Sequence, residues 1–364
     1  MKVAVNLLWC RPGRVGGSEE YLARQLDGLA RVAPEIELSL FTGRDWPSAH
    51  PQLADRVAAT CNWAGSRPAR LVAEAMWLRH RSRAADLVHH AGGTVPPAAR
   101  RPHVVTVHDL QYRSFPHYFS PLRRRYLDTM LPRSVRHAAV VTVPSEYVAS
   151  TVVEAFGVAA DRVVVVPHGI EPPTAPLPDA ADLRRRYALG ARRLVVFPAI
   201  THRHKGHRFL LDVAATRWPD DVAIVLLGGA GAADDDVAAA IDELHLGARV
   251  IRPGRVPSTD RDGLIAIAEA LVFPSEYEGF GAPVIEAMTV GTPVISSDRA
   301  ALPEVVGDGG LVLPLERDAW GGALDTIAAD RPHWIAAARR RAAAFTIEQS
   351  GAALATAYRR GTDR

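Results

Sequence analysis

The chain has little cysteine. Cys10 and Cys61 are the only two cysteines in 364 residues. Two isolated thiols exclude a disulfide framework, and their spacing fits no zinc site, so a reducing, cytoplasmic setting is expected. Both are expected to be ordinary buried or half-buried thiols.

Long apolar runs and repeats are also absent. No apolar stretch reaches membrane-spanning length, and residues 1–8 are too short for a secretion signal and favour a first strand. No repeat of solenoid length and no nucleic-acid-binding motif occurs, so a nucleic-acid partner is not expected. The 48% apolar and 23% charged residues are typical of a soluble globular protein, and 364 residues suit two domains.

The net charge of +3 hides an asymmetry between the halves. Residues 1–175 hold 21 Lys and Arg against 15 Asp and Glu, and the remainder holds 22 against 25. The basic clusters are Arg67, Arg70, Arg79, Arg81 and Arg83 around Trp77, and Arg123, Arg124 and Arg125 beside Tyr126. Such clusters dock on anionic lipid headgroups or an acidic acceptor, although a solvated helix face is the commoner use.

Apolar strand-like runs alternate with helical stretches in both halves, which predicts α/β domains with parallel, doubly wound sheets. The first set of runs starts at Lys2 and continues at 36–41, 86–89, 104–107, 140–143 and 163–166; the second lies at 194–197, 223–227, 249–251, 271–273 and 293–295. Prolines crowd residues 171–178 between the sets and predict a semi-rigid joint. The expected organisation is 1–170 as amino-terminal domain, 171–180 as linker, 181–344 as carboxyl-terminal domain and 345–364 as a final helical segment. Ligands of such sheets lie beyond the carboxyl ends of the strands, so we expect a site in a cleft between the domains.

The most informative stretch contains Glu278 and Glu286. It follows the strand-like run 270–273 and leads through Gly279 and Gly281 into a helix with Pro283 in its first turn. Glycines allow close backbone approach, and a helix N-terminus attracts phosphate. Carboxylates beside a phosphate need hydroxyl donors, which a diphosphate carrying ribose and a hexose supplies. A dipole-compensating surface residue is the alternative for Glu286.

The whole string from Tyr277 to Met288, followed by Gly291-Thr292-Pro293-Val294-Ile295, resembles the retaining glycosyltransferases of family four, also called glycosyl transferases group 1. The resemblance extends over most of the chain and implies the GT-B architecture, with two Rossmann-like domains facing a cleft. It also implies that 1–170 is the acceptor-side domain, that 181–344 binds the nucleotide sugar, and that the final helix, 347–359, crosses back onto the first domain.

The resemblance assigns donor contacts to the second domain. Lys205 is expected on the diphosphate, where its charge stabilises the leaving nucleotide. The arginine that many members have after this strand is replaced by Ala199, which leaves Arg203 or a histidine as second phosphate donor. Arg255 and Val256, in a segment expected to follow the strand 249–251, are expected near the base. The nucleotide-sugar contacts are completed by Glu278, Gly279, Phe280, Gly281, Ala282, Pro283 and Glu286, of which Glu278 is also expected to act in catalysis.

In the first domain, Gly16 and Gly17 form a turn before a helix for which Ser18 is the expected N-cap. The resemblance places this loop against the donor diphosphate or the acceptor; a purely structural turn is the alternative. His108 ends an apolar strand, and the resemblance implies that it approaches the transferring sugar and acts with Lys205 and Glu278. A structural histidine is the alternative, and Asp109 orients its ring or begins the next loop.

No metal is expected in the site. His202, His204 and His207 lack the spacing and the further ligands of a zinc site. Asp234, Asp235 and Asp236 resemble an acidic metal-binding triplet but fit a helix start, where aspartates favour the dipole. A cationic side chain and a helix N-terminus replace the metal in this interpretation.

These observations predict a metal-independent, retaining hexosyltransferase that uses a nucleoside-diphosphate sugar and no cofactor. GDP-mannose is favoured over dTDP-rhamnose and UDP-sugars because residues 204–207 look like segments of mannosyltransferases. A lipid-linked or oligosaccharide acceptor and a peripheral place at the inner membrane face are compatible with the basic clusters. A nucleotide-sugar epimerase or hydrolase and a non-catalytic sugar-nucleotide sensor are the alternatives. A nicotinamide oxidoreductase is disfavoured because residues 9–17 lack the compact dinucleotide fingerprint.

Overall fold

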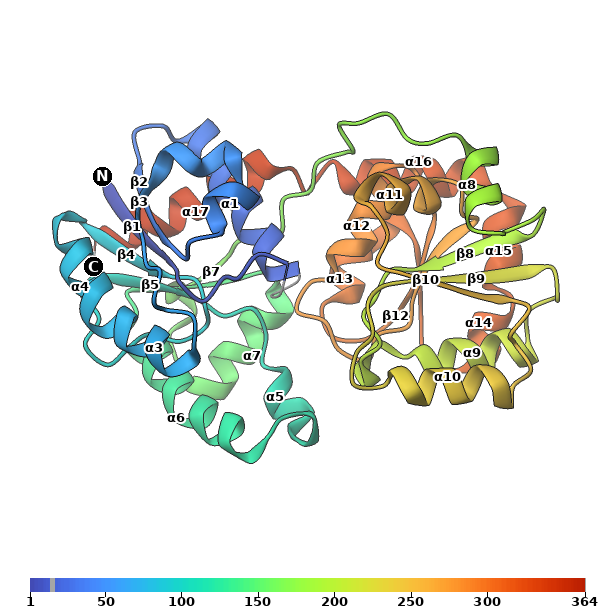
Figure 1. Ribbon diagram of the computed structural model, residues 1–364, viewed down its shortest axis with the longest axis horizontal. Coiled ribbons are helices and arrows are strands. Elements are labelled where there is room, and N and C mark those ends of the chain that lie inside the picture. The colour runs from blue at the N-terminus through green and yellow to red at the C-terminus, as the bar shows by residue number, and fades with distance from the viewer. Residues whose placement is uncertain (14–16, 364) are drawn as a thin grey trace. The chain divides into compact units, whose positions relative to one another are not determined.

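The computed structural model describes residues 1–13 and 17–363 and divides the chain into two compact units (Figure 1). Unit 1 comprises Met1–Gly169 together with Phe345–Arg364, and unit 2 comprises Ile170–Ala344. Residues 171–179 contain neither helix nor strand. None of the helices in the described residues is long and apolar enough to cross a bilayer.

Unit 1 is built on a parallel sheet of seven strands in the order β3-β2-β1-β4-β5-β6-β7. The strands are β1 (Lys2–Leu7), β2 (Glu37–Thr42), β3 (Val57–Thr60), β4 (Leu87–His90), β5 (His103–Thr106), β6 (Val140–Val143) and β7 (Val163–Val165). The α-helices are α1 (Gly17–Val32), α2 (Trp46–Ala49), α3 (Arg67–Val72), α4 (Arg79–Arg81), α5 (Gln111–Ser114), α6 (Pro121–His137), α7 (Glu146–Phe156) and α17 (Ile347–Thr362). The 3₁₀ helices are η1 (Pro51–Arg56), η3 (Ser82–Ala84), η4 (Pro116–Tyr118) and η5 (Ala160–Arg162), and η2 (Ala73–Leu78) is π-helical.

The last helix of the chain packs against the first helix of unit 1. Gly28 of α1 and Gly351 of α17 face each other so closely that a Cβ on either would overlap backbone atoms of the other helix. Tyr358 of α17 reaches the buried sheet, where its hydroxyl lies 2.8 Å from Nδ1 of His89. The Nε2 atom of His89 lies 2.7 Å from the Thr106 hydroxyl. Because both ring nitrogens have partners, this fully buried histidine is satisfied without charge.

Unit 2 contains a parallel six-stranded sheet in the order β10-β9-β8-β11-β12-β13. Its strands are β8 (Arg193–Phe197), β9 (Val222–Leu227), β10 (Val250–Gly254), β11 (Ala270–Phe273), β12 (Val294–Ser297) and β13 (Leu311–Leu313). Its helices are α8 (Ala180–Arg186), η6 (Arg203–Lys205), α9 (His207–Thr216), α10 (Asp234–Glu243), α11 (Ser258–Ala266), α12 (Ala282–Thr289), α13 (Leu302–Val306), η7 (Gly307–Gly309), α14 (Arg317–Gly321), α15 (Ala323–Ala329) and α16 (Arg331–Ala342). Helices cover both faces of each sheet (Figure 1), which confirms the predicted pair of doubly wound domains.

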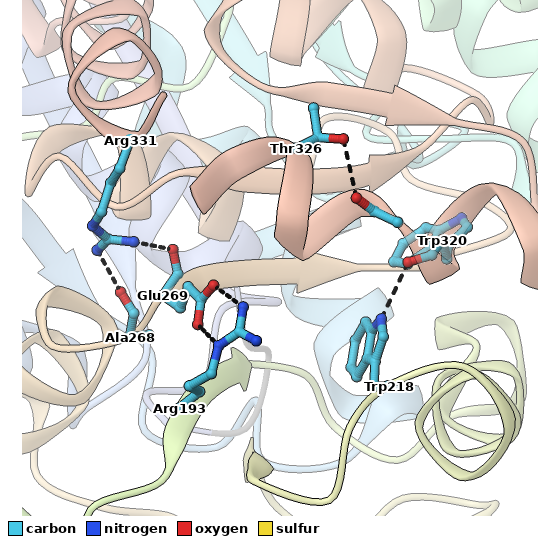
Figure 2. Close-up of polar contacts among 8 residues, drawn as sticks. Arg193, Trp218, Ala268, Glu269, Trp320, Thr326 and Arg331 are labelled. Carbon is cyan, nitrogen blue, oxygen red and sulfur yellow. Dashed lines mark hydrogen bonds and ion pairs between the residues drawn. The ribbon is translucent and has the colours of Figure 1, made fainter. Parts of the chain in front are cut away.

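Polar contacts hold the amino-terminal end of the central strands of unit 2 (Figure 2). The Arg193 guanidinium donates to both carboxylate oxygens of Glu269, at 2.8 and 2.5 Å. Arg331, at the start of α16, donates to the carbonyl oxygens of Glu269 and Ala268 at 2.6 and 3.0 Å. These bonds lie just before β11, so they hold the amino-terminal end of this strand and do not involve its carboxyl end.

Three local expectations need correction. The strands β3 and β13 are four and three residues long and were not predicted, because so few residues show little periodicity. Ser18 lies inside α1, which begins at Gly17, so it is not the N-cap. The strand β10 continues to Gly254, so Arg252 belongs to the strand and only Arg255 and Val256 follow it.

Candidate functional site

Two loops of unit 2 meet at the carboxyl ends of neighbouring strands. One follows β8 and includes Lys205; the other follows β11 and includes Glu278. The backbone N–H of Glu276 donates to the carbonyl oxygen of His204 at 2.7 Å. The Lys205 ammonium donates to Oε1 of Glu278 at 2.6 Å. The structure thus brings together two of the three residues expected to act in catalysis.

The ion pair between Lys205 and Glu278 is largely shielded from solvent. The Lys205 side chain is 19% exposed and the Glu278 side chain 13%. The Lys205 Nζ atom also lies 5.8 Å from the centre of the Phe273 ring, at the end of β11. Shielding strengthens charge interactions, so the pair places a preoriented cation and a carboxylate side by side at the strand ends.

Two glycines allow close packing around this pair. Gly206 has φ +78°, and a Cβ there would overlap the Pro274 carbonyl oxygen. Gly281, with φ +94°, is the N-cap of α12, and a Cβ on it would lie 2.7 Å from a Leu302 methyl group. Any other residue would be strained and would push these segments apart. Ala282 and Pro283 form the first turn of α12, as predicted, so the helix N-terminus begins directly after the Glu278 loop.

Glu286 lies on the second turn of α12. Its side chain is 18% exposed, and a carboxylate oxygen lies 3.9 Å from an Arg261 guanidinium nitrogen. Carboxylate oxygens at such a half-buried position can accept hydrogen bonds from hydroxyl groups.

The predicted phosphate donor Arg203 forms an ion pair with Asp236. Its guanidinium lies 3.2 Å from an Asp236 carboxylate oxygen, and both side chains are more than half exposed. Asp234, at the start of α10 as predicted, accepts from the Thr201 hydroxyl at 2.9 Å and from Arg252 at 2.5 Å. Asp234 and Asp236 therefore connect the loop after β8 with the segment after β9. Among the described residues, no group of three or more His, Cys, Asp or Glu side chains could hold a metal ion.

Two of the three predicted histidines stack on each other, and the third is buried at the start of α9. The rings of His202 and His204 are stacked, with centroids 5.8 Å apart. Burial, followed by the neighbouring Lys205 and His202, lowers the pKa of His204 to about 3. His207 is buried at the start of α9, with its ring 4.6 Å from that of Phe197, and burial lowers its pKa to about 4. Both imidazoles are therefore neutral near pH 7 and add no positive charge to that of Lys205.

The remaining predicted residues of unit 2 lie in the same loops or beside them. Gly279 and Phe280 complete the loop between Glu278 and α12, and the Phe280 side chain is buried. Arg255 and Val256 lie between β10 and α11, with Arg255 exposed. Ala199, where the resemblance leads one to expect an arginine, is buried, and its carbonyl oxygen packs where a Cβ of Gly228 would be.

In unit 1, His108 follows β5 and lies in an aromatic cluster. Its Nε2 atom lies 2.9 Å from the Ala91 carbonyl oxygen, which only accepts, so Nε2 carries the proton. The rings of Trp9 and Tyr21 both lie 5.8 Å from the imidazole. Burial lowers the pKa of His108, against smaller opposing effects of the Ala91 carbonyl and Asp109. The imidazole is therefore neutral near pH 7, and Nδ1 presents a lone pair.

Sequence reasoning missed the partners of His108. His168 follows β7 and stacks on Tyr21 with ring centroids 4.0 Å apart, and the Tyr21 hydroxyl donates to the Val166 carbonyl oxygen at 2.7 Å. The signal for His168 was its place beyond the end of β7, because ligands of open sheets collect at strand ends, whereas Tyr21 lies within α1. Asp109 accepts from the Gln111 N–H at 2.9 Å and so begins the next loop. Gly17 is the first residue of α1, whereas Gly16 lies outside the described residues. The predicted meeting of His108 with Lys205 and Glu278 stays a prediction.

Comparisons with known proteins identify the class. The model of "Glycosyl transferases group 1" matches residues 180–343, and that of "Glycosyltransferase Family 4" matches residues 15–173. HepE from Anabaena, solved with UDP and glucose, superposes with a TM-score of 0.74 at 21% identity, covering 99% of each chain. The fold is therefore the GT-B architecture.

Two relatives are named for the sugar that they transfer. The chain is 31% identical to O-antigen chain mannosyltransferase B of Escherichia coli, over 77% of this chain and 78% of that protein. It is 27% identical to O-antigen chain mannosyltransferase RfbU of Salmonella typhimurium, over 66% of this chain and 63% of that protein. The chain belongs to the group 1 glycosyltransferases and is an enzyme of that class. This membership favours transfer over the epimerase, hydrolase and sensor alternatives.

Proposed function

We propose that the protein transfers mannose from GDP-mannose to a hydroxyl group of a saccharide or lipid-linked saccharide, with retention of the anomeric configuration and without a metal ion. The two mannosyltransferase relatives support the sugar. The observation that carries the proposal is the shielded pair of Lys205 and Glu278 directly before the N-terminus of α12. UDP-sugars, the ligands of HepE, and dTDP-rhamnose are the alternative donors.

In this proposal the unit 2 residues bind the donor. Lys205 and the N-terminal amides of α12 receive the diphosphate, whose charge grows as the bond to the sugar breaks. Glu278 orients the ammonium and accepts hydrogen bonds from hydroxyl groups of the hexose. Glu286 accepts from the ribose hydroxyls, and Arg203 exchanges its exposed contact with Asp236 for the phosphate. In this proposal, Lys205 and the N-terminal amides of α12 stabilise the diphosphate charge, as a divalent ion does in other transferases.

His108 contacts the transferring sugar from unit 1. Its protonated Nε2 is held by the Ala91 carbonyl, so Nδ1 accepts a hydrogen bond from a sugar hydroxyl. In the transfer step, the bond from the anomeric carbon to the phosphate oxygen breaks, and the acceptor oxygen bonds to the anomeric carbon on the same face. The acceptor proton passes to the departing phosphate oxygen. No nucleophile of the enzyme is assigned.

A binding and transfer experiment tests the donor. Melting temperatures are compared with GDP, UDP and dTDP, because only a ligand that prefers the folded state raises stability. The three sugar nucleotides are then supplied with saccharide acceptors, and the anomer of the product is assigned by NMR. GDP should raise the melting temperature most, and an α-mannoside should form. If only UDP or dTDP raised the melting temperature, the proposed donor GDP-mannose would be wrong. A β-mannoside product would refute retention.

A basic and apolar surface of unit 1 supports a peripheral place at the inner membrane face. We define it as the exposed parts of segments 63–83 and 121–126. These segments contain the eight arginines of the basic clusters and a single acidic residue, Glu74. Glu74 is buried, and its carboxylate lies 3.7 Å from the Arg70 guanidinium. Leu122 is 80% exposed and Met76 69%. The Arg67 guanidinium lies 4.5 Å over the Tyr126 ring, so α3 and α6 are neighbours. Cations beside exposed apolar side chains fit an anionic bilayer surface.

Vesicle sedimentation tests this surface. The whole chain should bind vesicles of phosphatidylcholine mixed with phosphatidylglycerol and should not bind phosphatidylcholine alone. The double substitution Leu122→Gln and Met76→Gln should weaken binding, whereas Leu177→Gln, which changes an exposed leucine of unit 2, should not. Equal binding of all three proteins would exclude this surface as the docking site.

A further inference from the structure

The hydrogen bond to the Ala91 carbonyl oxygen fixes only one atom of the His108 ring. Nε2 donates this bond at 2.9 Å. The torsion angle between Cβ and the ring of a histidine is broadly distributed, so one hydrogen bond restrains it weakly. A half-turn about this bond would exchange Nδ1 with the ring carbon Cδ2, and the lone pair would leave its place. The orientation of His108 therefore depends also on the rings that pack against it.

The first of these rings belongs to Trp9, in the loop after β1. Its centroid lies 5.8 Å from that of the imidazole, with 54° between the ring planes. Gly92, which directly follows Ala91, makes room for the indole, because a Cβ on this residue would lie 2.6 Å from Cδ1 of Trp9. A side chain at position 92 would displace the indole. Residues 91 and 92 therefore hold both His108 and one of its aromatic neighbours.

The second ring belongs to Tyr21, in α1. It meets the imidazole edge to face, with centroids 5.8 Å apart and 79° between the planes, a favoured arrangement of aromatic pairs. Tyr21 is 2% exposed. Its hydroxyl donates to the Val166 carbonyl oxygen at 2.7 Å and accepts from the Gln25 side-chain amide at 2.9 Å. Burial raises the pKa of the Tyr21 phenol, so it stays protonated and keeps both bonds.

His168 supports Tyr21 from the segment after β7. The two rings are stacked, with centroids 4.0 Å apart and 18° between the planes. Burial, followed by the nearby His108, lowers the pKa of His168 well below its usual value. Both imidazoles are therefore neutral near pH 7 and do not repel each other. Because Val166 and His168 are two positions apart, one short segment holds both the hydroxyl and the face of Tyr21.

We propose that Tyr21 is a positioning residue for His108 and that His168 supports it. The fixed phenol ring opposes the half-turn of the imidazole, so Nδ1 keeps its lone pair in the direction of the sugar hydroxyl. The consequence for transfer rests on the proposed function, whereas the orientation of the imidazole does not. If Tyr21 only filled the core, its loss would lower stability and leave the state of His108 unchanged.

The protonation of the two His108 nitrogens tests the orientation directly. The whole enzyme is labelled with ¹⁵N-histidine, and nitrogen chemical shifts above about pH 7 distinguish a protonated ring nitrogen from one with a lone pair. The His108 signals are those that disappear in His108→Ala. The wild type and Tyr21→Phe, which keeps the ring, should show only the Nε2–H form. Tyr21→Leu should show both forms, and a single Nε2–H form in this variant would overturn the proposal.

Tyr112→Leu is the matched control, because it removes another buried tyrosine of unit 1, 5% exposed, that packs on Phe119. It should keep the single Nε2–H form of His108. His168→Leu is a second test variant, since a half-buried side chain is easier to replace than Tyr21. It should show both forms of His108, as Tyr21→Leu does. Equal spectra of His108 in Tyr112→Leu, His168→Leu and the wild type would exclude the support by His168.

Kinetics show whether Tyr21 acts through His108. Tyr21→Leu should lower kcat about two- to tenfold, the effect of losing one aromatic pair, and leave the donor KM and the Kd for GDP unchanged. Tyr21→Phe should restore most of the rate. Added to His108→Ala, the change Tyr21→Leu should have no further effect, because the residue that it positions is gone. A further loss of the same size would mean that Tyr21 acts independently of His108 and would overturn the proposal.

The two measurements separate this proposal from the proposed function. Suppose that folded His108→Ala turns over at the wild-type rate while Tyr21→Leu shows both forms of His108. The role of His108 in transfer would then be refuted, and the positioning assignment would stand. A roughly hundredfold loss in His108→Ala, with unchanged His108 signals in Tyr21→Leu, would refute the positioning and keep the function.

Discussion

The Nζ atom of Lys205 lies 2.6 Å from Oε1 of Glu278, although the two residues are 73 positions apart in the chain. The pair has two consequences for a donor diphosphate. Glu278 holds the ammonium in place before the ligand arrives, and it also neutralises part of the charge that the ligand would bind. In the proposed donor complex, a phosphate group shares Lys205 with the carboxylate, and hydrogen bonds from sugar hydroxyls to Glu278 would compensate for this.

Replacing Lys205 should weaken binding and slow transfer together. Lys205→Ala removes a charge that acts in the ground state and in the transition state, so diphosphate affinity and kcat should both fall. Isothermal titration with GDP and initial rates measure the two effects. The matched control is Lys2→Ala, because Lys2 is the only other lysine and lies at the exposed start of β1. An unchanged GDP affinity in Lys205→Ala would remove this residue from the phosphate site.

Glu286→Ala should weaken binding of the nucleoside diphosphate even without its sugar, because the proposed partners are ribose hydroxyls. Loss of charge-assisted hydrogen bonds predicts a rise in Kd of about tenfold or more. Glu278→Ala should instead chiefly impair the recognition or transfer of the sugar. Glu276→Ala is the control, because the exposed Glu276 side chain lies in the same loop as Glu278. Calorimetry measures the Kd of each variant for GDP. An unaltered Kd for Glu286→Ala would refute the proposed contact of this residue with the ribose.

The paired sheets could be predicted from the sequence because most strands are apolar runs bounded by turn residues. The start of α12 was equally predictable, since Gly281 and Pro283 have distinct local meanings. The contact of Lys205 with Glu278 could not be predicted from spacing, because it depends on β8 and β11 being neighbours in the sheet. The surroundings of His108 were hidden for the same reason: Trp9, Tyr21 and His168 come from three separate segments. A pocket at the carboxyl ends of β1, β2 and β3 likewise needs three loops at once.

Transfer should survive an excess of EDTA. Lys205 and the N-terminus of α12 are proposed to stabilise the departing diphosphate, so removal of divalent ions should leave the initial rate within about twofold of its original value. The rate is measured after dialysis against EDTA and again after addition of Mn²⁺ or Mg²⁺. Complete loss of activity that manganese restores would contradict metal-independent transfer.

Acid should destabilise unit 1 through its buried histidines. Burial lowers the pKa of His89 from 6.5 to about 3. Above pH 6.5 this histidine is neutral in the folded and in the unfolded chain, so its burial carries no protonation cost there. As the pH falls from 6.5 toward 3, the unfolded chain binds a proton that the folded chain does not, which costs about 1.4 kcal/mol per pH unit. His89→Gln should be less stable near pH 7, because it disturbs the contacts with Tyr358 and Thr106, but should lose less stability by about pH 5. Urea unfolding at both pH values measures this, and an equal loss in both proteins would contradict it.

His108→Ala should lower turnover and leave the binding of free GDP nearly unchanged. The imidazole is neutral, with Nε2 held by the Ala91 carbonyl, so its proposed contribution is a hydrogen bond from a sugar hydroxyl to Nδ1. A bond of this kind made chiefly in the transition state is worth about 2.7 to 4 kcal/mol, or roughly a hundred- to thousand-fold in rate. His137→Ala, at an exposed histidine of α6, is the control and should keep its activity. Rates are compared at saturating donor and acceptor, with circular dichroism to verify folding. Wild-type turnover by folded His108→Ala would refute the proposed role of this histidine in transfer.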